Sequence, residues 1–241
     1  MRQDGRREDE LRPLLLKRRY LKHTDGSCYI QMGDTWVICS ATIEERVPPF
    51  LKDTGTGWIT AEYSMIPGST EIRISREHAA GGRSQEIQRM IGRSLRAVVD
   101  LSRLGERTIR IDCDVIQADG GTRVASVIGG FVALTEAIYQ LRWKKIISRW
   151  PLKDWLGAVD VGLVGGKPML DLNFSEDSQA DADMNVVMTS KGEIVEIQVT
   201  AERRTIRRED FNALLNLAWR GIEKVIEQLK KELQEIWMDS S

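Results

Sequence analysis

Apolar positions change their spacing within one stretch of the chain, residues 111–134. Up to Ile116 the pattern is that of a buried strand, whereas from about Val124 the apolar residues recur at helical spacing. Between the two patterns lies a glycine-rich segment from Gln117 to Arg123, with the sequence QADGGTR. The pattern predicts a strand that leads through a tight turn into a helix.

The same criteria predict the other elements. A β-hairpin is expected over 29–44, with its turn at Gly33 and Asp34, and a helix is expected from Ser84 to a stop at Gly105. Strands are expected over 58–65, 158–164, 167–174, 184–188 and 193–200, and an amphipathic helix over 211–237. This order predicts an α+β protein in which two β/α halves, roughly residues 1–140 and 141–241, form one compact domain.

Both ends of the chain are expected to pack poorly. The amino-terminal segment 1–12 carries Arg2, Arg6, Arg7 and Arg12 among acidic residues, which predicts a solvated arm. The end of the last helix is expected to fray.

Composition limits the classes of partner. The net charge of the 241 residues is only −1, so a surface for RNA must be a local cluster of basic side chains. The three cysteines lie in apolar runs, and their odd number argues against a disulfide framework or a zinc site. The polar amino terminus and the absence of a continuous apolar run of about 18 residues predict a cytoplasmic protein with no membrane partner.

The glycine-rich turn has the residues needed to hold an oxyanion, phosphate above all. Gly120 and Gly121 allow close approach of backbone, Thr122 can cap the following helix, and Arg123 lies beside the positive end of its dipole. The alternative is an ordinary turn in which Arg123 is solvated or paired with Asp119. Neither a Walker A loop nor a dinucleotide fingerprint is present.

A second helix start repeats this arrangement, because Arg83 follows Gly81 and Gly82. Two such helix starts could face one anion.

An acidic segment provides candidate metal ligands. Residues 175–185 contain four carboxylates within eight residues, from Glu176 to Asp183, and hard oxygen ligands of this kind suit Mg²⁺. The alternative is an acidic surface loop. If a phosphate site lies beside this segment, the interpretation as a Mg²⁺ site is favoured over the acidic surface loop. With only two histidines, the chemistry should need little proton abstraction, and inorganic phosphate is a nucleophile that is already anionic.

Four long stretches closely resemble the ribonuclease PH family. They are GWITAEYSMIP (57–67), GGRSQEIQRMIGRSLRAVVDL (81–101), GERTIRIDCDVIQADGGTR (105–123) and EDSQADADMNVVM (176–188). The resemblance implies a ribosomal-protein-S5-domain-2-like fold in tandem β/α halves, assembled as a homo-hexamer that is a trimer of dimers. It also implies an enzyme that trims the 3′ ends of tRNA precursors with inorganic phosphate, releases nucleoside diphosphates, and runs in reverse as a nucleotidyltransferase.

The resemblance also implies residue roles. Phosphate would be bound by Arg83, Gly121, Thr122 and Arg123, the last of these also catalytic. Asp177 and Asp183 would be the catalytic carboxylates that hold Mg²⁺, and Arg73 and Arg76 would bind tRNA. The chain departs from the family at Gly68, where arginine is usual, in a shortened loop at 77–80, and in the turn at 199–206, which lacks the usual glycines.

Two rival functions remain open from the sequence. One is a ring subunit like those of the exosome or polynucleotide phosphorylase, acting on broader RNA. The other is a ring component that binds RNA without catalysis. The presence of Arg83, Thr122, Arg123, Asp177 and Asp183 together argues against the second.

Overall fold

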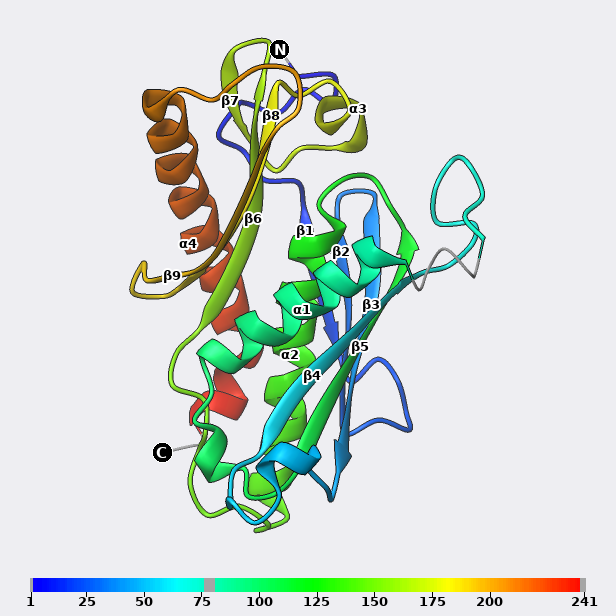
Figure 1. Ribbon diagram of the computed structural model, residues 1–241, viewed down its shortest axis with the longest axis vertical. Coiled ribbons are helices and arrows are strands. Elements are labelled where there is room, and N and C mark those ends of the chain that lie inside the picture. The colour runs from blue at the N-terminus through cyan, green and yellow to red at the C-terminus, as the bar shows by residue number, and fades with distance from the viewer. Residues whose placement is uncertain (1, 76–80, 239–241) are drawn as a thin grey trace.

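Helix α2 (Thr122–Trp143) packs between two β-sheets in the computed structural model, which describes residues 2–75 and 81–238 (Figure 1). Helix α1 (Gly82–Ala97) contacts α2 and the edge of the first sheet, and α4 (Arg208–Met238) packs against the second sheet. The molecule is elongated, with α4 along one side (Figure 1). This mixed α/β arrangement confirms the predicted fold class.

The first sheet has the strand order β1-β2-β3-β5-β4. Its strands are β1 (Leu14–Arg18), β2 (Gly26–Met32), β3 (Thr35–Glu44), β4 (Trp58–Met65) and β5 (Thr108–Gln117). Only β4 and β5 are parallel, because α1 connects them. The predicted hairpin is confirmed, with Gly33 in its turn at a φ of 55°.

The second sheet has the order β7-β6-β8-β9. Its strands are β6 (Leu156–Val164), β7 (Lys167–Leu170), β8 (Ala182–Thr189) and β9 (Ile194–Ala201). The predicted strand 167–174 is too long. Asp171 has a φ of 54°, and the short helix α3 (Phe174–Asp177) then begins after Asn173, whose side chain accepts from the Glu176 N–H at 3.0 Å.

Two predicted helix ends also need correction. The helix from Ser84 ends at Ala97, and a 3₁₀ turn η3 (Leu101–Arg103) follows Asp100, whose side chain caps it. A second 3₁₀ turn, η1 (Pro49–Leu51), precedes β4. The last helix continues to Met238, since the Trp237 ring stacks on Trp155 with centroids 3.9 Å apart.

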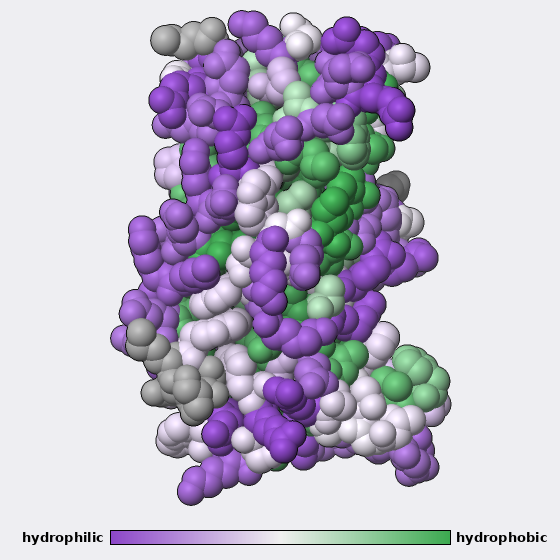
Figure 2. All heavy atoms as spheres, turned by 90° about the vertical axis from the view of Figure 1, so that its left-hand side faces the viewer, coloured by the Kyte–Doolittle hydropathy of each residue, from purple (hydrophilic) through white to green (hydrophobic). Residues whose placement is uncertain are grey.

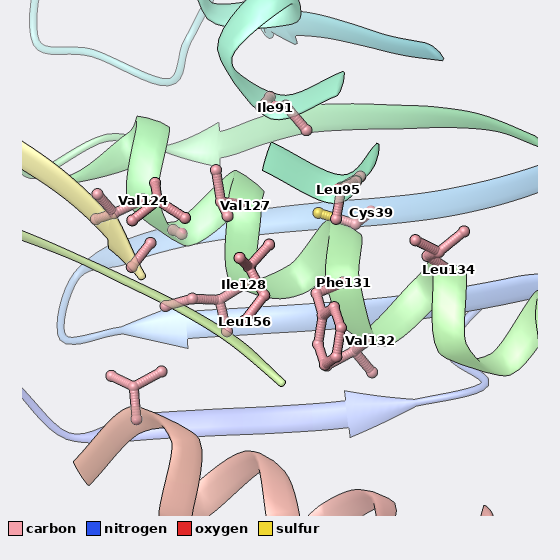
Figure 3. Close-up of a cluster of buried hydrophobic side chains, with 14 of the residues drawn as sticks. Cys39, Ile91, Leu95, Val124, Val127, Ile128, Phe131, Val132, Leu134 and Leu156 are labelled. Carbon is pink, nitrogen blue, oxygen red and sulfur yellow. The ribbon is translucent and has the colours of Figure 1, made fainter. Parts of the chain in front are cut away.

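Helix α2 is the centre of the hydrophobic core (Figure 3). A Cβ on Gly129 would lie 2.7 Å from Cys39 Sγ, so glycine lets the helix approach the first sheet closely. By length and composition α2 alone among the described helices could cross a membrane, but 89% of its most apolar window is buried inside the protein. Cys28, Cys39 and Cys113 are buried and free, as predicted.

The prediction of a solvated amino-terminal arm is wrong for three of its four arginines, whereas Arg7 is exposed. Arg2, Arg6 and Arg12 are all buried. Arg2 Nε donates to Glu176 Oε1 at 2.7 Å, and Arg12 Nη2 donates to Asp171 Oδ1 at 2.6 Å. Carboxylates 174 and 159 residues away in sequence therefore neutralise Arg2 and Arg12, and these ion pairs tie the arm to the segment that leads into α3 and to α3 itself.

Candidate active site

A cleft of about 700 Å³ lies where the starts of α1 and α2 face α3 and the second sheet. It brings together the predicted residues Arg83, Gly121, Thr122, Arg123, Asp177 and Asp183. Arg73 is exposed on the surface and does not line the cleft. Arg76 lies outside the described residues. The roles assigned to all of these residues stay predictions.

Glycine is required at both positions of the turn before α2. Gly120 and Gly121 have φ values of 76° and 68°, a conformation that strains residues with a side chain. A Cβ on Gly120 would lie 2.4 Å from the carbonyl oxygen of Leu172. The turn therefore packs directly against the segment that precedes α3, so that both halves of the chain build one site.

The turn before α2 is fixed by hydrogen bonds from the side chains of Arg12 and Thr35 to its carbonyl oxygens. Arg12 Nη1 donates to the carbonyl oxygen of Asp119 at 2.5 Å, and Thr35 Oγ1 donates to that of Gly120 at 2.5 Å. Arg12 is fixed in turn by its ion pair with Asp171. Asp119 pairs with Arg12 rather than with Arg123, which rules out the alternative pairing considered from the sequence.

The two helix starts present their N–H groups without side-chain caps. Gly81 is the N-cap of α1 and Gly121 is that of α2, and neither can contribute a capping side chain. The expectation that Thr122 caps α2 is wrong, since Thr122 is the first helical residue and its hydroxyl is bonded to Tyr63 Oη at 2.9 Å. The positive ends of both helix dipoles are thus open to an anion.

Arg123 is incompletely paired. Its Nη1 donates to Gln198 Oε1 at 3.4 Å, and its Nη2 lies 3.9 Å from Glu86 Oε2. Arg123 Nε is buried and has no hydrogen-bond partner within the described residues. A buried donor without a partner is costly, and an oxyanion in the cleft would satisfy it.

The cleft that contains Arg83 and Arg123 is also lined by two carboxylates, Asp177 and Asp183. Burial raises the pKa of Asp177, with Arg83 and Arg123 opposing the shift. Burial also raises the pKa of Asp183, and the neighbouring charge of Asp177 adds to it. Two desolvated carboxylates that repel each other are stabilised by a cation.

The other two carboxylates of the acidic segment, Glu176 and Asp181, form ion pairs with arginines. Glu176 pairs with Arg2, and Asp181 Oδ2 lies 3.3 Å from Arg204 Nε. Within residues 2–75 and 81–238 no group of three or more His, Cys, Asp or Glu side chains could hold a metal. Mg²⁺ fits a pair of carboxylates nevertheless, because it commonly keeps water and substrate phosphate oxygens as its other ligands.

Sequence reasoning missed Asp160, a buried residue in β6 that lines the cleft. Burial raises its pKa to about 7, the charge of Asp171 adds to the shift, and Arg12 opposes it. Its Oδ2 accepts from the Leu172 N–H at 2.8 Å, while Oδ1 has no partner in the described part of the chain. A single acid within an otherwise apolar strand was the signal that could have identified it.

The departure at 199–206 leaves the site intact. The N–H groups of Glu202 and Arg203 both donate to the carbonyl oxygen of Asp181, at 3.0 and 3.1 Å. None of the described residues in this turn has a positive φ, so glycine is not needed there. Arg203 instead adds a side chain to the wall of the cleft, where its Nη2 donates to the carbonyl oxygen of Ser178 at 3.0 Å.

Comparison with known sequences identifies the family. Residues 10–139 match the first domain of the 3′ exoribonuclease family, and residues 154–221 match its second domain. The chain belongs to the 3′ exoribonuclease family. Within this family it is 58% identical over 239 residues to the ribonuclease PH of Moorella thermoacetica, covering 98% of this chain and 96% of that protein. It is 55% identical over 240 residues to the ribonuclease PH of Bacillus mycoides, covering 98% of both.

Solved structures support the same fold. An Archaeoglobus fulgidus exosome with RNA bound to the active site matches with a TM-score of 0.83 at 22% identity, covering 95% of this chain and 92% of the other. An archaeal exosome core matches with a TM-score of 0.78 at 22% identity, covering 94% and 90%. The predicted tandem architecture of the 3′ exoribonuclease family is therefore confirmed, while the grouping of both halves into a single domain stays a prediction.

Proposed function

We propose that the protein is a phosphate-dependent 3′-to-5′ exoribonuclease, which trims the 3′ ends of tRNA precursors and releases nucleoside diphosphates. One observation carries the proposal. The open helix starts with Arg83 and Arg123 face the carboxylates Asp177 and Asp183 across one cleft, as a reaction between two phosphate groups requires. Membership in the 3′ exoribonuclease family and the ribonuclease PH relatives support it.

The cleft provides what the reaction needs. Arg83, Arg123 and the N–H groups at the start of α2 bind inorganic phosphate and orient one oxygen toward the phosphorus of the last RNA linkage. A bond forms between that oxygen and the phosphorus, and the bond from the phosphorus to O3′ of the preceding nucleotide breaks. The O3′ takes up the proton that hydrogen phosphate gives up, so that the shortened RNA ends in a 3′-hydroxyl. The arginines offset the charge at the phosphorus. The products are a nucleoside diphosphate and RNA shortened by one nucleotide, and the reverse reaction extends RNA.

Asp177 and Asp183 would hold Mg²⁺, which supplies Lewis-acid stabilisation of the phosphate oxygens when bound. Replacing either residue by asparagine should abolish Mg²⁺-dependent turnover in both directions, because the two directions share one transition state. The rates of phosphorolysis and of extension from nucleoside diphosphates measure this. A variant that still extends RNA at the wild-type rate would contradict the assignment.

A ring of copies of this chain is part of the proposal, as a trimer of dimers. Strand β9 is an edge of the second sheet, and its Ile194 and Val199 side chains are 55% and 43% exposed. Apolar atoms interrupt the polar surface on the side of the molecule that carries α4 and β9 (Figure 2). An unpaired edge with exposed apolar side chains is suited to a subunit contact.

The buried free cysteines support the cytoplasmic location expected from the sequence.

One assay tests the activity and separates the rivals. RNA labelled in the nucleotides of a 3′ tail is incubated with and without inorganic phosphate, and labelled nucleoside diphosphate is measured. A phosphorolytic enzyme releases it only when phosphate is present, whereas a ring component that only binds RNA releases none. Comparing a tRNA precursor with unstructured RNA of equal length separates a tRNA-trimming enzyme from a subunit that acts on broader RNA.

A further inference from the structure

Phe174 is the one aromatic residue among those that line the cleft within the described part of the chain. It is the first residue of α3, and 58% of its surface is exposed. Its ring forms none of the ring pairs found among the described residues. The phosphate chemistry of the cleft makes no use of an aromatic side chain, so this ring is available to a ligand.

The segment that carries the ring is fixed at both ends. The Phe174 N–H donates to Asp119 Oδ1 at 3.1 Å, which ties it to the turn before α2. Asn173 and Glu176 bond reciprocally through side chain and backbone, and Glu176 is paired with Arg2. The backbone at Phe174 is thus ordered without a ligand, so that little entropy is lost when one binds.

The position of the ring relative to the reacting groups points to a base. Phe174 and Asp177 are three residues apart on α3 and lie on the same helix face. A nucleotide whose phosphate lies near Asp177 carries its base one sugar away from that phosphate. The exposed ring therefore lies on the side of the cleft where the base of the reacting nucleotide is to be expected.

We propose that Phe174 is a stacking platform for the base at the 3′ end of the RNA substrate. This inference rests on the proposed function, since it assumes an RNA 3′ end in the cleft. Every base has a π-face, so a stacking contact holds any terminal nucleotide without selecting a sequence. Purines stack over a larger area than pyrimidines, and a 3′-terminal purine should bind more tightly.

The experiment compares wild type with Phe174→Ala and Phe174→Trp on two RNAs, one with a 3′-terminal adenosine and one with a 3′-terminal abasic ribose. On the adenosine substrate Phe174→Ala should raise KM by between about fivefold and about a hundredfold, the range for loss of one stacked base, with a smaller change in kcat. Phe174→Trp should retain the wild-type KM. On the abasic substrate the three proteins should have the same KM to within about twofold.

Phe50→Ala is the matched control, because Phe50 is 67% exposed and packs edge-on against Trp58, at the end of β4 away from the cleft residue Met65. It should leave KM unchanged.

A binding readout uses RNA with 2-aminopurine at its 3′ end, whose fluorescence should be quenched by wild type and not by Phe174→Ala. The proposal is overturned if Phe174→Ala leaves KM and quenching unchanged, or if it raises KM equally on both RNAs. If wild type releases no nucleoside diphosphate, the proposed function fails, while the fluorescence still reports on stacking.

Discussion

At the scale of single residues, Arg123 gives the clearest chemical signal in the cleft, because its buried Nε has no partner within the described residues. Arg123→Ala should raise the phosphate concentration needed for half-maximal rate and slow phosphorolysis by about two orders of magnitude, the usual effect of losing one charged donor at a reacting centre. Arg83→Ala should act in the same direction. Rates over a phosphate series measure both effects.

Arg93→Ala is a suitable control for this pair, since Arg93 is on α1 but pairs with Glu196 at 2.7 Å and does not line the cleft. It should leave the phosphate dependence unchanged. If the phosphate dependence is also unchanged in Arg123→Ala and Arg83→Ala, then Arg83 and Arg123 do not form the phosphate-binding site.

Asp160 makes the free energy of unfolding depend on pH. Its pKa is raised to about 7 in the folded protein, mainly by burial, whereas an unfolded aspartate titrates near 4. Between these values the folded state binds the extra proton. The free energy of unfolding should therefore fall as pH rises through this interval, by up to about 1.4 kcal/mol per pH unit, and level off above about pH 7.

Asp160→Asn removes the titrating group while keeping an oxygen to accept from the Leu172 N–H. Denaturant unfolding of wild type and variant between about pH 4 and pH 8 measures the difference between their stabilities. The free energy of unfolding of the variant should increase relative to that of wild type as pH rises, and the difference should stay constant above about pH 7. Parallel curves over the whole range would show that Asp160 is ionised in the folded protein.

At the scale of elements, local pattern predicted the strands and helices with strong periodicity, α2 and the β2–β3 hairpin among them. The repeated pattern of glycines followed by arginine led to the hypothesis that the starts of α1 and α2 face one anion, and residues from both helix starts line the same cleft. It failed for segment 1–12 and for the end of the predicted strand 167–174, because partners distant in sequence determine both. An arginine that will be buried against Asp171 cannot be distinguished locally from a solvated one.

The ion pairs of segment 1–12 should be essential to the fold. Arg12 is buried, binds Asp171 and donates to the carbonyl oxygen of Asp119. Arg12→Ala removes the nearest cation from buried Asp171 and leaves it only Arg6, whose Nη1 lies 3.5 Å from Asp171 Oδ2. We therefore expect a loss of about 3 kcal/mol in the free energy of unfolding, at the lower end of the range for breaking a buried ion pair. Urea unfolding at one protein concentration measures it.

Arg7 offers the comparison within the same segment. It is largely exposed and its Nε lies 3.3 Å from Asp9 Oδ1, so Arg7→Ala should change stability by no more than about 0.5 kcal/mol. If Arg12→Ala costs no more than Arg7→Ala, segment 1–12 does not hold the site in place.

At the scale of the whole molecule, a net charge of −1 means that recognition of tRNA depends on local basic surface. The loop before α1 is the candidate, with Arg73 exposed in its described part. Gly68 in this loop is exposed, and a Cβ there would have no heavy atom within 4 Å. The Cβ of an introduced arginine therefore fits at this exposed position.

Gly68→Arg should strengthen binding of a tRNA precursor and steepen its salt dependence, because one more phosphate contact releases about one more counterion. The proposed role of the loop as a contact for the folded body of tRNA predicts a smaller effect on an unstructured RNA of equal length. Affinities for both RNAs across a salt series measure this. Gln234→Arg adds the same charge on an exposed position in the last turns of α4. These turns lie on the opposite side of the molecule from the end of β4 that leads into the loop (Figure 1). If Gly68→Arg changes tRNA binding no more than Gln234→Arg does, the loop is not the tRNA contact, and Arg73 and Arg76 lose their proposed role.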